Sequence, residues 1–180
     1  MKIDVLCRRC NCFYKFQWLL VVACFFFTLG CNNGIEEEVY YIPEGFLGGG
    51  HIIYSQETGV ATEYDGNARI YRIPSNGVLI TRFKTNAGLI KNENIRRYYY
   101  INNLGEIVDT IPGLYSETSD EVKAMNHIGV INFGYSGTKL DGKEIQFSYF
   151  MVDTLNRINQ KYRSLYDDQY GIILNALQKE

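Results

Sequence analysis

The stretch Glu144–Val152, EIQFSYFMV, follows the dipeptide Asp141-Gly142 and decides the fold class of this 180-residue chain. Its apolar residues alternate and so share one face of an extended strand: Ile145, Phe147, Tyr149 and Met151. Asp-Gly between two apolar runs is typical of a tight hairpin turn, and the run Ile128–Tyr135 precedes it. This part of the chain therefore predicts a β-hairpin.

Short runs rich in β-branched and aromatic residues recur through the rest of the chain, at spacings typical of β-sandwiches. They are Val39–Ile42, His51–Tyr54, Val60–Tyr64, Ala68–Ile73, Val78–Phe83, Arg96–Ile101 and Gly105–Ile111. Ser75-Asn76-Gly77 predicts a hairpin, and Asn102-Asn103-Leu104 predicts another. Because no helical pattern alternates with these runs, we expect a mainly β chain, an antiparallel β-sandwich of about eight short strands with a C-terminal α-helix.

The helix is predicted from the last part of the sequence. Asp153 or Thr154 can cap it. Apolar side chains then recur at helical spacing on one stripe: Leu155, Ile158, Tyr162, Leu165, Tyr166, Ile173 and Leu177. We expect residues 153–180 to pack on a β-sandwich domain of residues 39–152, and the alternative is a helix that meets a partner chain.

Basic residues at the N-terminus precede a 12-residue apolar run, Trp18–Leu29. A membrane-spanning helix needs about 20 apolar residues, so the shorter run favours a secretory signal. Its end, Thr28-Leu29-Gly30-Cys31, resembles the lipobox of bacterial lipoproteins, with Thr28 in place of the usual Leu. The resemblance implies a signal peptide of residues 1–30, cleavage before Cys31 and lipid attached to Cys31. An uncleaved N-terminal anchor is the alternative.

The residues after Cys31 are polar, and we interpret residues 31–38 as a flexible tether. The acidic run Glu36–Glu38 resembles the surface-export signal of lipoproteins in some Gram-negative groups, and a merely solvated linker is an equal alternative. These features predict an extracytoplasmic, lipid-anchored protein of the cell envelope, at the outer membrane and surface-exposed if the acidic run acts as that signal.

Cysteine and charge exclude several classes of site and partner. All five Cys lie within the first 31 residues, so a chain that starts at Cys31 forms no internal disulfide. Residues 1–30 hold four basic residues and one acidic residue. Of the 18 Lys and Arg and the 20 Asp and Glu, 14 basic and 19 acidic residues therefore remain, a net charge of −5. This balance argues against a nucleic-acid partner. The cluster Cys7-x-x-Cys10-x-Cys12 looks like a metal-ligand pattern, but it lacks a second pair or a His at zinc-finger spacing and lies in the segment expected to be removed. We therefore expect no metal site and no cofactor.

Three short motifs resemble an uncharacterised bacterial domain family whose members are often lipoproteins and open with Ile-Pro-x-Gly-aromatic. They are Tyr41–Phe46, Ile52–Tyr54 and Tyr71–Thr81, and the likeness covers Val39 to Val152. The resemblance implies an extracytoplasmic β domain and carries no site residues.

Candidate site residues are few. Alternation along Tyr98-Tyr99-Tyr100 places Tyr98 and Tyr100 on one face, where an exposed pair could stack on a sugar or a peptide; a core face is the simpler interpretation. Gly134-Tyr135-Ser136-Gly137-Thr138 nearly matches a hydrolase nucleophile elbow, but that motif needs a later His, and both His51 and His127 precede Ser136.

The sequence therefore predicts a non-catalytic binding or structural module with no cofactor, held at the membrane through lipid on Cys31, with an envelope protein or a glycan as its partner. The alternative is an enzyme accessory or weak hydrolase that uses His127 and loop carboxylates.

Overall fold

The computed structural model describes residues 35–86, 95–114 and 127–178, with side chains 159–167 of the last helix left out. These residues belong to one compact unit, Ile35–Glu180. The predicted signal peptide and Cys31 lie outside the described residues. Within the searched part of the chain, no helix is both long and apolar enough to span a bilayer.

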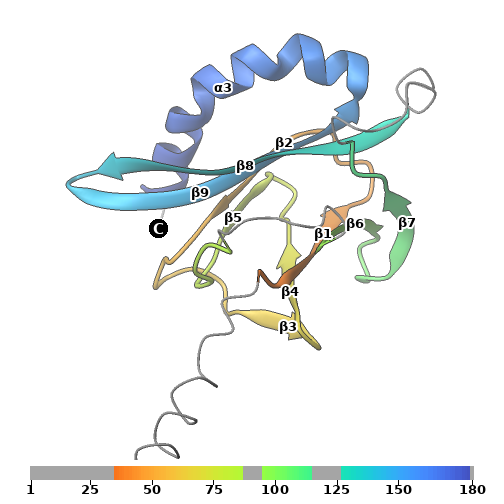
Figure 1. Cartoon of the computed structure of the whole chain (residues 1–180), viewed down its shortest axis with the longest axis horizontal. Helices are drawn as coiled ribbons and strands as arrows, with labels where there is room; N and C mark the ends of the chain where they lie inside the picture. Colours follow the sequence, from red (N-terminus) through yellow and green to blue (C-terminus); the bar gives the residue numbers. More distant parts are fainter. Residues whose placement is uncertain (1–34, 87–94, 115–126, 179–180) are drawn as a thin grey trace, which may run out of the picture. The chain divides into compact units, whose positions relative to one another are not determined.

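In the described part of the chain, nine strands form two mixed sheets, and the helix α3 follows them (Figure 1). In order across the five-stranded sheet lie β3 (Glu63–Asp65), β4 (Ala68–Arg72), β1 (Glu37–Pro43), β6 (Arg96–Ile101) and β7 (Ile107–Ile111). In order across the four-stranded sheet lie β5 (Val78–Ile80), β2 (Gly48–Ile53), β9 (Lys143–Thr154) and β8 (Ile128–Leu140). The helix α3 (Leu155–Leu177) covers the face of the four-stranded sheet opposite the five-stranded sheet. The predicted mainly β class with a C-terminal helix is confirmed.

The β8–β9 hairpin forms where the sequence predicts it. Asp141 and Gly142 both have positive φ, 49° and 80°, as the type I′ turn that matches strand twist requires. β8 is longer than expected, because it continues past a bulge between Asn132 and Tyr135 up to Leu140. The antiparallel β6–β7 pair is also confirmed.

The expected all-antiparallel pairing is wrong, because β1 runs parallel to both β4 and β6, and β2 runs parallel to β5. The predicted hairpin at Ser75-Asn76-Gly77 is wrong for a related reason. Gly77 N–H bonds to Pro74 O at 2.8 Å, and within this turn Gly77 alone has positive φ. Such a turn splays its strands. The chain therefore leaves the five-stranded sheet at β4 and joins the four-stranded sheet at β5.

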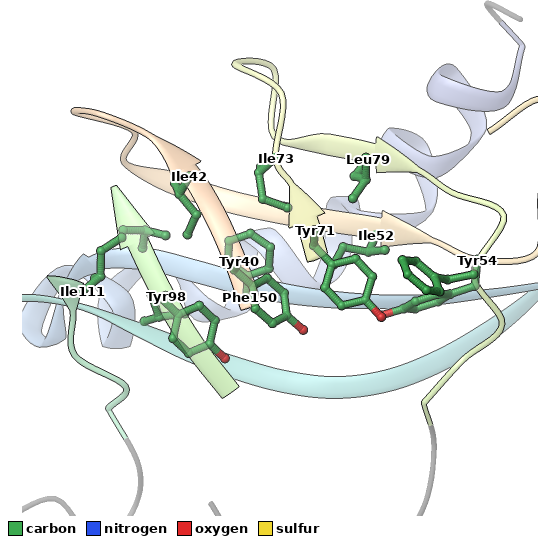
Figure 2. Close-up of a cluster of buried hydrophobic side chains, with 13 residues drawn as sticks. Tyr40, Ile42, Ile52, Tyr54, Tyr71, Ile73, Leu79, Tyr98, Ile111 and Phe150 are labelled. Atoms are coloured by element: carbon green, nitrogen blue, oxygen red, sulfur yellow. The ribbon is translucent and has the colours of Figure 1, made fainter. Parts of the chain in front are cut away.

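The two sheets bury a core of aliphatic and aromatic side chains between them (Figure 2). The ring of Tyr40 lies at its centre, with ring centroids 5.1 Å from Tyr71, 4.8 Å from Tyr98 and 5.6 Å from Phe150. A second cluster forms under the helix, where Ile173 of α3 packs with Phe147 of β9. The four-stranded sheet is thus covered on both faces.

The boundary expected for the polar tether, residues 31–38, is wrong at its C-terminal end. Glu37 and Glu38 belong to β1, and Glu38 is fully buried. Glu36 is held as well, because its N–H donates to Asn86 Oδ1 at 3.0 Å and its carbonyl accepts from Asn86 Nδ2 at 2.7 Å. A run of three glutamates suggests a solvated linker, but strand alternation turns its last member inward.

Two strand glycines provide a matched test of the core. A Cβ at Gly50 of β2 would lie 2.2 Å from the Phe150 ring, whereas one at Gly137 of β8 would meet nothing closer than 3.6 Å. We expect Gly50→Ala to destabilise the fold by about 1–3 kcal/mol through overpacking. Gly137→Ala should change stability by less than about 0.5 kcal/mol. Urea denaturation of both variants checks this, and equal effects would contradict the described packing.

Candidate functional site

An open cleft of about 460 Å³ lies between β6, β7 and the start of β8. Its described lining is Tyr100, Asp109, Thr110, Ile111, Pro112, His127 and Ile128. Two residues that the sequence singles out, Tyr100 and His127, therefore come together although 26 positions separate them. Asp109 joins them, and it has no local motif that would identify it.

The cleft lies beside the point at which the two sheets meet. Immediately after β7, Leu114 N–H donates to Val130 O at 2.7 Å, and Val130 N–H donates to Pro112 O at 2.9 Å. These bonds join the end of the five-stranded sheet to β8 of the four-stranded sheet. They join the chain just after β7, which carries Asp109, to the start of β8, which follows His127.

The polar groups of the cleft differ in the hydrogen bonds and ion pairs that they already form. The hydroxyl of the half-buried Tyr100 donates to Phe46 O at 3.0 Å. Burial, and then the charges of Asp109 and Asp153, raise the pKa of Tyr100, so this hydroxyl is protonated at neutral pH. One oxygen of Asp109 accepts from Thr110 N–H at 2.8 Å, and no described cation pairs with this carboxylate. His127 is exposed.

Tyr98 and Tyr100 do not form the exposed aromatic pair that the sequence suggested. Tyr98 is 2 % exposed and lies in the core between the sheets (Figure 2), and Tyr100 is partly buried against the same cluster. Both side chains face inward. The predicted alternation along β6 is therefore correct, and the face that Tyr98 and Tyr100 share is the core face of the sheet. Tyr100 reaches the cleft because it lies two residues nearer the open end of β6.

The other candidates from the sequence lie elsewhere. Ser136 pairs with Phe147 inside the β8–β9 ladder, so the sharp strand-to-helix turn of a nucleophile elbow is absent there. His51 is buried on β2, with its ring 6.4 Å from that of Tyr149. Within the described residues, no three His, Cys, Asp or Glu side chains are grouped as a metal site would require.

A second polar site, inside the core, was missed by sequence reasoning. The buried Glu38 carboxylate accepts hydrogen bonds from five side chains. Oε2 accepts from Arg96 Nε at 2.8 Å and Tyr40 OH at 3.0 Å; Oε1 accepts from Tyr135 OH at 2.8 Å, Asn86 Nδ2 at 3.2 Å and, at 3.4 Å, Tyr71 OH. We call these six residues the Glu38 network.

Burial, reinforced by the charge of Glu38, raises the pKa of the Tyr40, Tyr71 and Tyr135 hydroxyls. They therefore remain protonated and act as donors. With Arg96 as counter-ion and its oxygens fully hydrogen-bonded, Glu38 has no free position for a substrate, and its role is structural. The only sequence signal was the inward position of Glu38 in the alternation of Val39–Ile42.

Removing the Glu38 carboxylate should destabilise the fold strongly. Glu38→Ala leaves the partly buried Arg96 and several hydroxyl donors without this acceptor, so we expect a loss of about 3–5 kcal/mol. The neighbouring Glu37 is a matched control, because its ion pair with Arg97 is exposed on both sides. Glu37→Ala should cost at most about 1 kcal/mol. Equal losses in chemical denaturation would rule out this role of the network.

His51 gives the fold a pH dependence. Burial, opposed in part by the charge of Asp168, lowers the pKa of His51 to about 4 from its ordinary value of 6.5. Between pH about 6.5 and about 4, His51 is therefore protonated in the unfolded chain and neutral in the folded chain. Stability should fall as the pH falls through this window, by up to about 3 kcal/mol.

His51→Phe should remove this contribution, so that the stability difference between variant and wild type changes with pH only inside the window. Urea denaturation at several pH values measures the difference. His127→Gln is the control, since His127 is exposed and the dependence due to His51 should persist in that variant. A pH-independent difference for His51→Phe would contradict the assignment.

Comparison with known proteins finds a family and a similar fold, and neither match assigns an activity. A family model described as a family of unknown function, DUF6843, matches residues 35–162. A solved structure described as "Putative Lipoprotein from Bacillus anthracis" is similar to this chain with a TM-score of 0.50 and 15% sequence identity, over 66% of this chain and 70% of the other. At that identity the likeness shows the fold alone. No protein of the curated set matches.

The family match covers the region Val39–Val152 in which the sequence resembles an uncharacterised family. It shows membership of a family of unknown function. The lipobox-like residues and the Ile-Pro-x-Gly-aromatic opening stay predictions from the sequence.

Proposed function

The chain belongs to the DUF6843 family of unknown function, and we propose that this protein is a lipid-anchored, non-catalytic binding module of the cell envelope. Lipid on Cys31 holds it to the membrane, and the cleft formed by Tyr100, Asp109 and His127 is its ligand site. The observation that carries the proposal is this cleft. It combines a carboxylate that forms no ion pair with any described Lys or Arg, an imidazole and an aromatic side chain at the meeting point of two sheets.

The anchor is supported by the sequence. The apolar run Trp18–Leu29 is too short for a span and is followed by Gly30-Cys31, which fit the two most demanding positions of a lipobox. The description of the similar Bacillus anthracis structure, "Putative Lipoprotein", agrees with this proposal. A single acyl chain gives only marginal membrane binding, so the lipoprotein resemblance, which implies three chains, accounts for stable attachment.

The non-catalytic role is supported by the groups that line the cleft. General acid–base catalysis uses a positioned proton donor and acceptor, and nucleophilic catalysis uses a nucleophile beside a base. Among the described lining residues, Asp109 is the single carboxylate, and one of its oxygens already accepts from Thr110 N–H. The Tyr100 hydroxyl is engaged with Phe46 O. Such groups can fix a ligand in place.

An enzyme that uses His127 and a loop carboxylate is the second candidate, favoured by the fact that His127 and Asp109 line the same cleft. It would need one of them to abstract or deliver a proton. Turnover of a bound ligand that disappears in His127→Gln, while the ligand still binds, would favour this candidate over the binding module.

The anchor is tested by metabolic labelling with palmitate and by intact-mass measurement of the product. We expect label in the wild-type protein and a mature chain that starts at an acylated Cys31. Cys31→Ser should carry no label and should keep residues 1–30, because its side chain cannot form the thioether. Cys12→Ser, a matched change in the segment to be removed, should be labelled and cleaved normally. An unmodified Cys31 thiol in the wild type would refute the anchor.

A further inference from the structure

Exposed apolar side chains border the cleft. Ile107 is 53% exposed, Val108 44% and Ile128 38%. Ile107 and Val108 directly precede Asp109 on β7, and Ile128 itself lines the cleft. β7 is an outer strand of its sheet, with β6 as its single neighbour there. We call these three residues the apolar rim: Ile128 lies in the cleft, and Ile107 and Val108 lie on β7 next to Asp109.

The charge of the cleft is negative. Asp109 is the one formally charged residue in the described lining, and no described Lys or Arg forms an ion pair with it. Tyr100 lines the same space. His127 adds a nitrogen that, in the neutral ring, can accept a hydrogen bond. A carboxylate, with an imidazole nitrogen as a further acceptor, fits an ammonium or guanidinium group.

We propose that the cleft binds a lysine or arginine side chain of a partner polypeptide, whose neighbouring apolar residues pack on Ile107, Val108 and Ile128. This inference rests on the proposed function and names the ligand class of the same cleft. Charge complementarity with Asp109 selects the basic residue, and the apolar rim favours a polypeptide over a free amine, because a free amine would leave the rim exposed.

Side chains, rather than strand pairing, carry this recognition. A peptide that extended the sheet would need the free N–H and C=O groups along β7. Asp109 already takes the N–H of Thr110, and Pro112 has none to give. An acidic side chain and a proline at the margin are devices that protect an outer strand from pairing. The partner therefore inserts a side chain without adding a strand.

A saccharide fits the cleft less well. Stacking on a sugar ring needs a broad exposed aromatic face, but Tyr98 is buried in the core and Tyr100 is partly buried, with its hydroxyl bound to Phe46 O. The described lining then leaves few directional polar groups for sugar hydroxyls. Binding of a glycan is therefore one of the outcomes that the titration below distinguishes.

Nuclear magnetic resonance of the full-length protein in detergent tests the proposal. The probes are acetyl-Ile-Lys-Val-amide, its counterpart with Gln in place of Lys, and the trisaccharide of N-acetylglucosamine, each at millimolar concentrations. We expect the Lys peptide to shift the His127 and Tyr100 resonances and the Gln peptide to leave them unchanged. Asp109→Asn keeps an oxygen for Thr110 N–H, so it should fold normally and weaken binding by about tenfold or more.

Asp65→Asn is the matched control, because it removes the same charge from β3, at the opposite edge of the sheet, and should leave affinity unchanged. Equal shifts by the two peptides, or an unaltered affinity in Asp109→Asn, would overturn the cation site. Shifts produced by the trisaccharide alone would overturn the ligand class and keep the binding module. Cleft resonances that no probe moves would count against both.

Discussion

The Glu38 network is the interaction on which the rest of the structure depends. An isolated carboxylate in a protein interior is very costly, so this one is tolerated only where donors converge on it. Arg96 lies on β6, Tyr71 on β4 and Tyr135 on β8, so the donors come from both sheets. Glu38 is satisfied only when the five-stranded and four-stranded sheets face each other in this register. Alternative strand pairings that leave the Glu38 carboxylate without enough hydrogen-bond donors are higher in free energy.

A buried ion pair of this kind contributes more to uniqueness than to net stability, because desolvation offsets much of the attraction. Here the apolar contacts supply the driving force, with Tyr40, Tyr98 and Phe150 packed between the sheets. The Glu38 network selects which apolar arrangement is allowed. It also fixes where the domain begins, since its acid lies one residue after the start of β1. A chain that leaves the domain at this point is held by the core rather than by a loose linker.

Local sequence predicted those features that local chemistry determines. Asp141-Gly142 specifies a type I′ hairpin because both residues accept positive φ, and the stripe through Ile158 and Ile173 specifies the buried face of α3. Ser75-Asn76-Gly77 also has the sequence of a hairpin turn. Its first two residues have negative φ, however, and the flanking strands β4 and β5 lie in different sheets. Parallel pairing of β1 with β4 and β6 depends on long connections, which leave no local pattern.

The same distinction explains what the sequence revealed of the sites. Tyr100 and His127 could be named as candidates, but the bonds between Pro112, Leu114 and Val130 that bring their strands together are contacts between backbones, which no residue type encodes. Asp109 and Glu38 show the consequence most clearly, because in sequence both are ordinary acidic residues. Among the described residues, Glu38 has five side-chain donors, whereas Asp109 accepts from a single backbone N–H beside an open cleft. A carboxylate whose hydrogen bonds are complete can only hold the fold together, whereas one with unused capacity at a surface can recognise a cation.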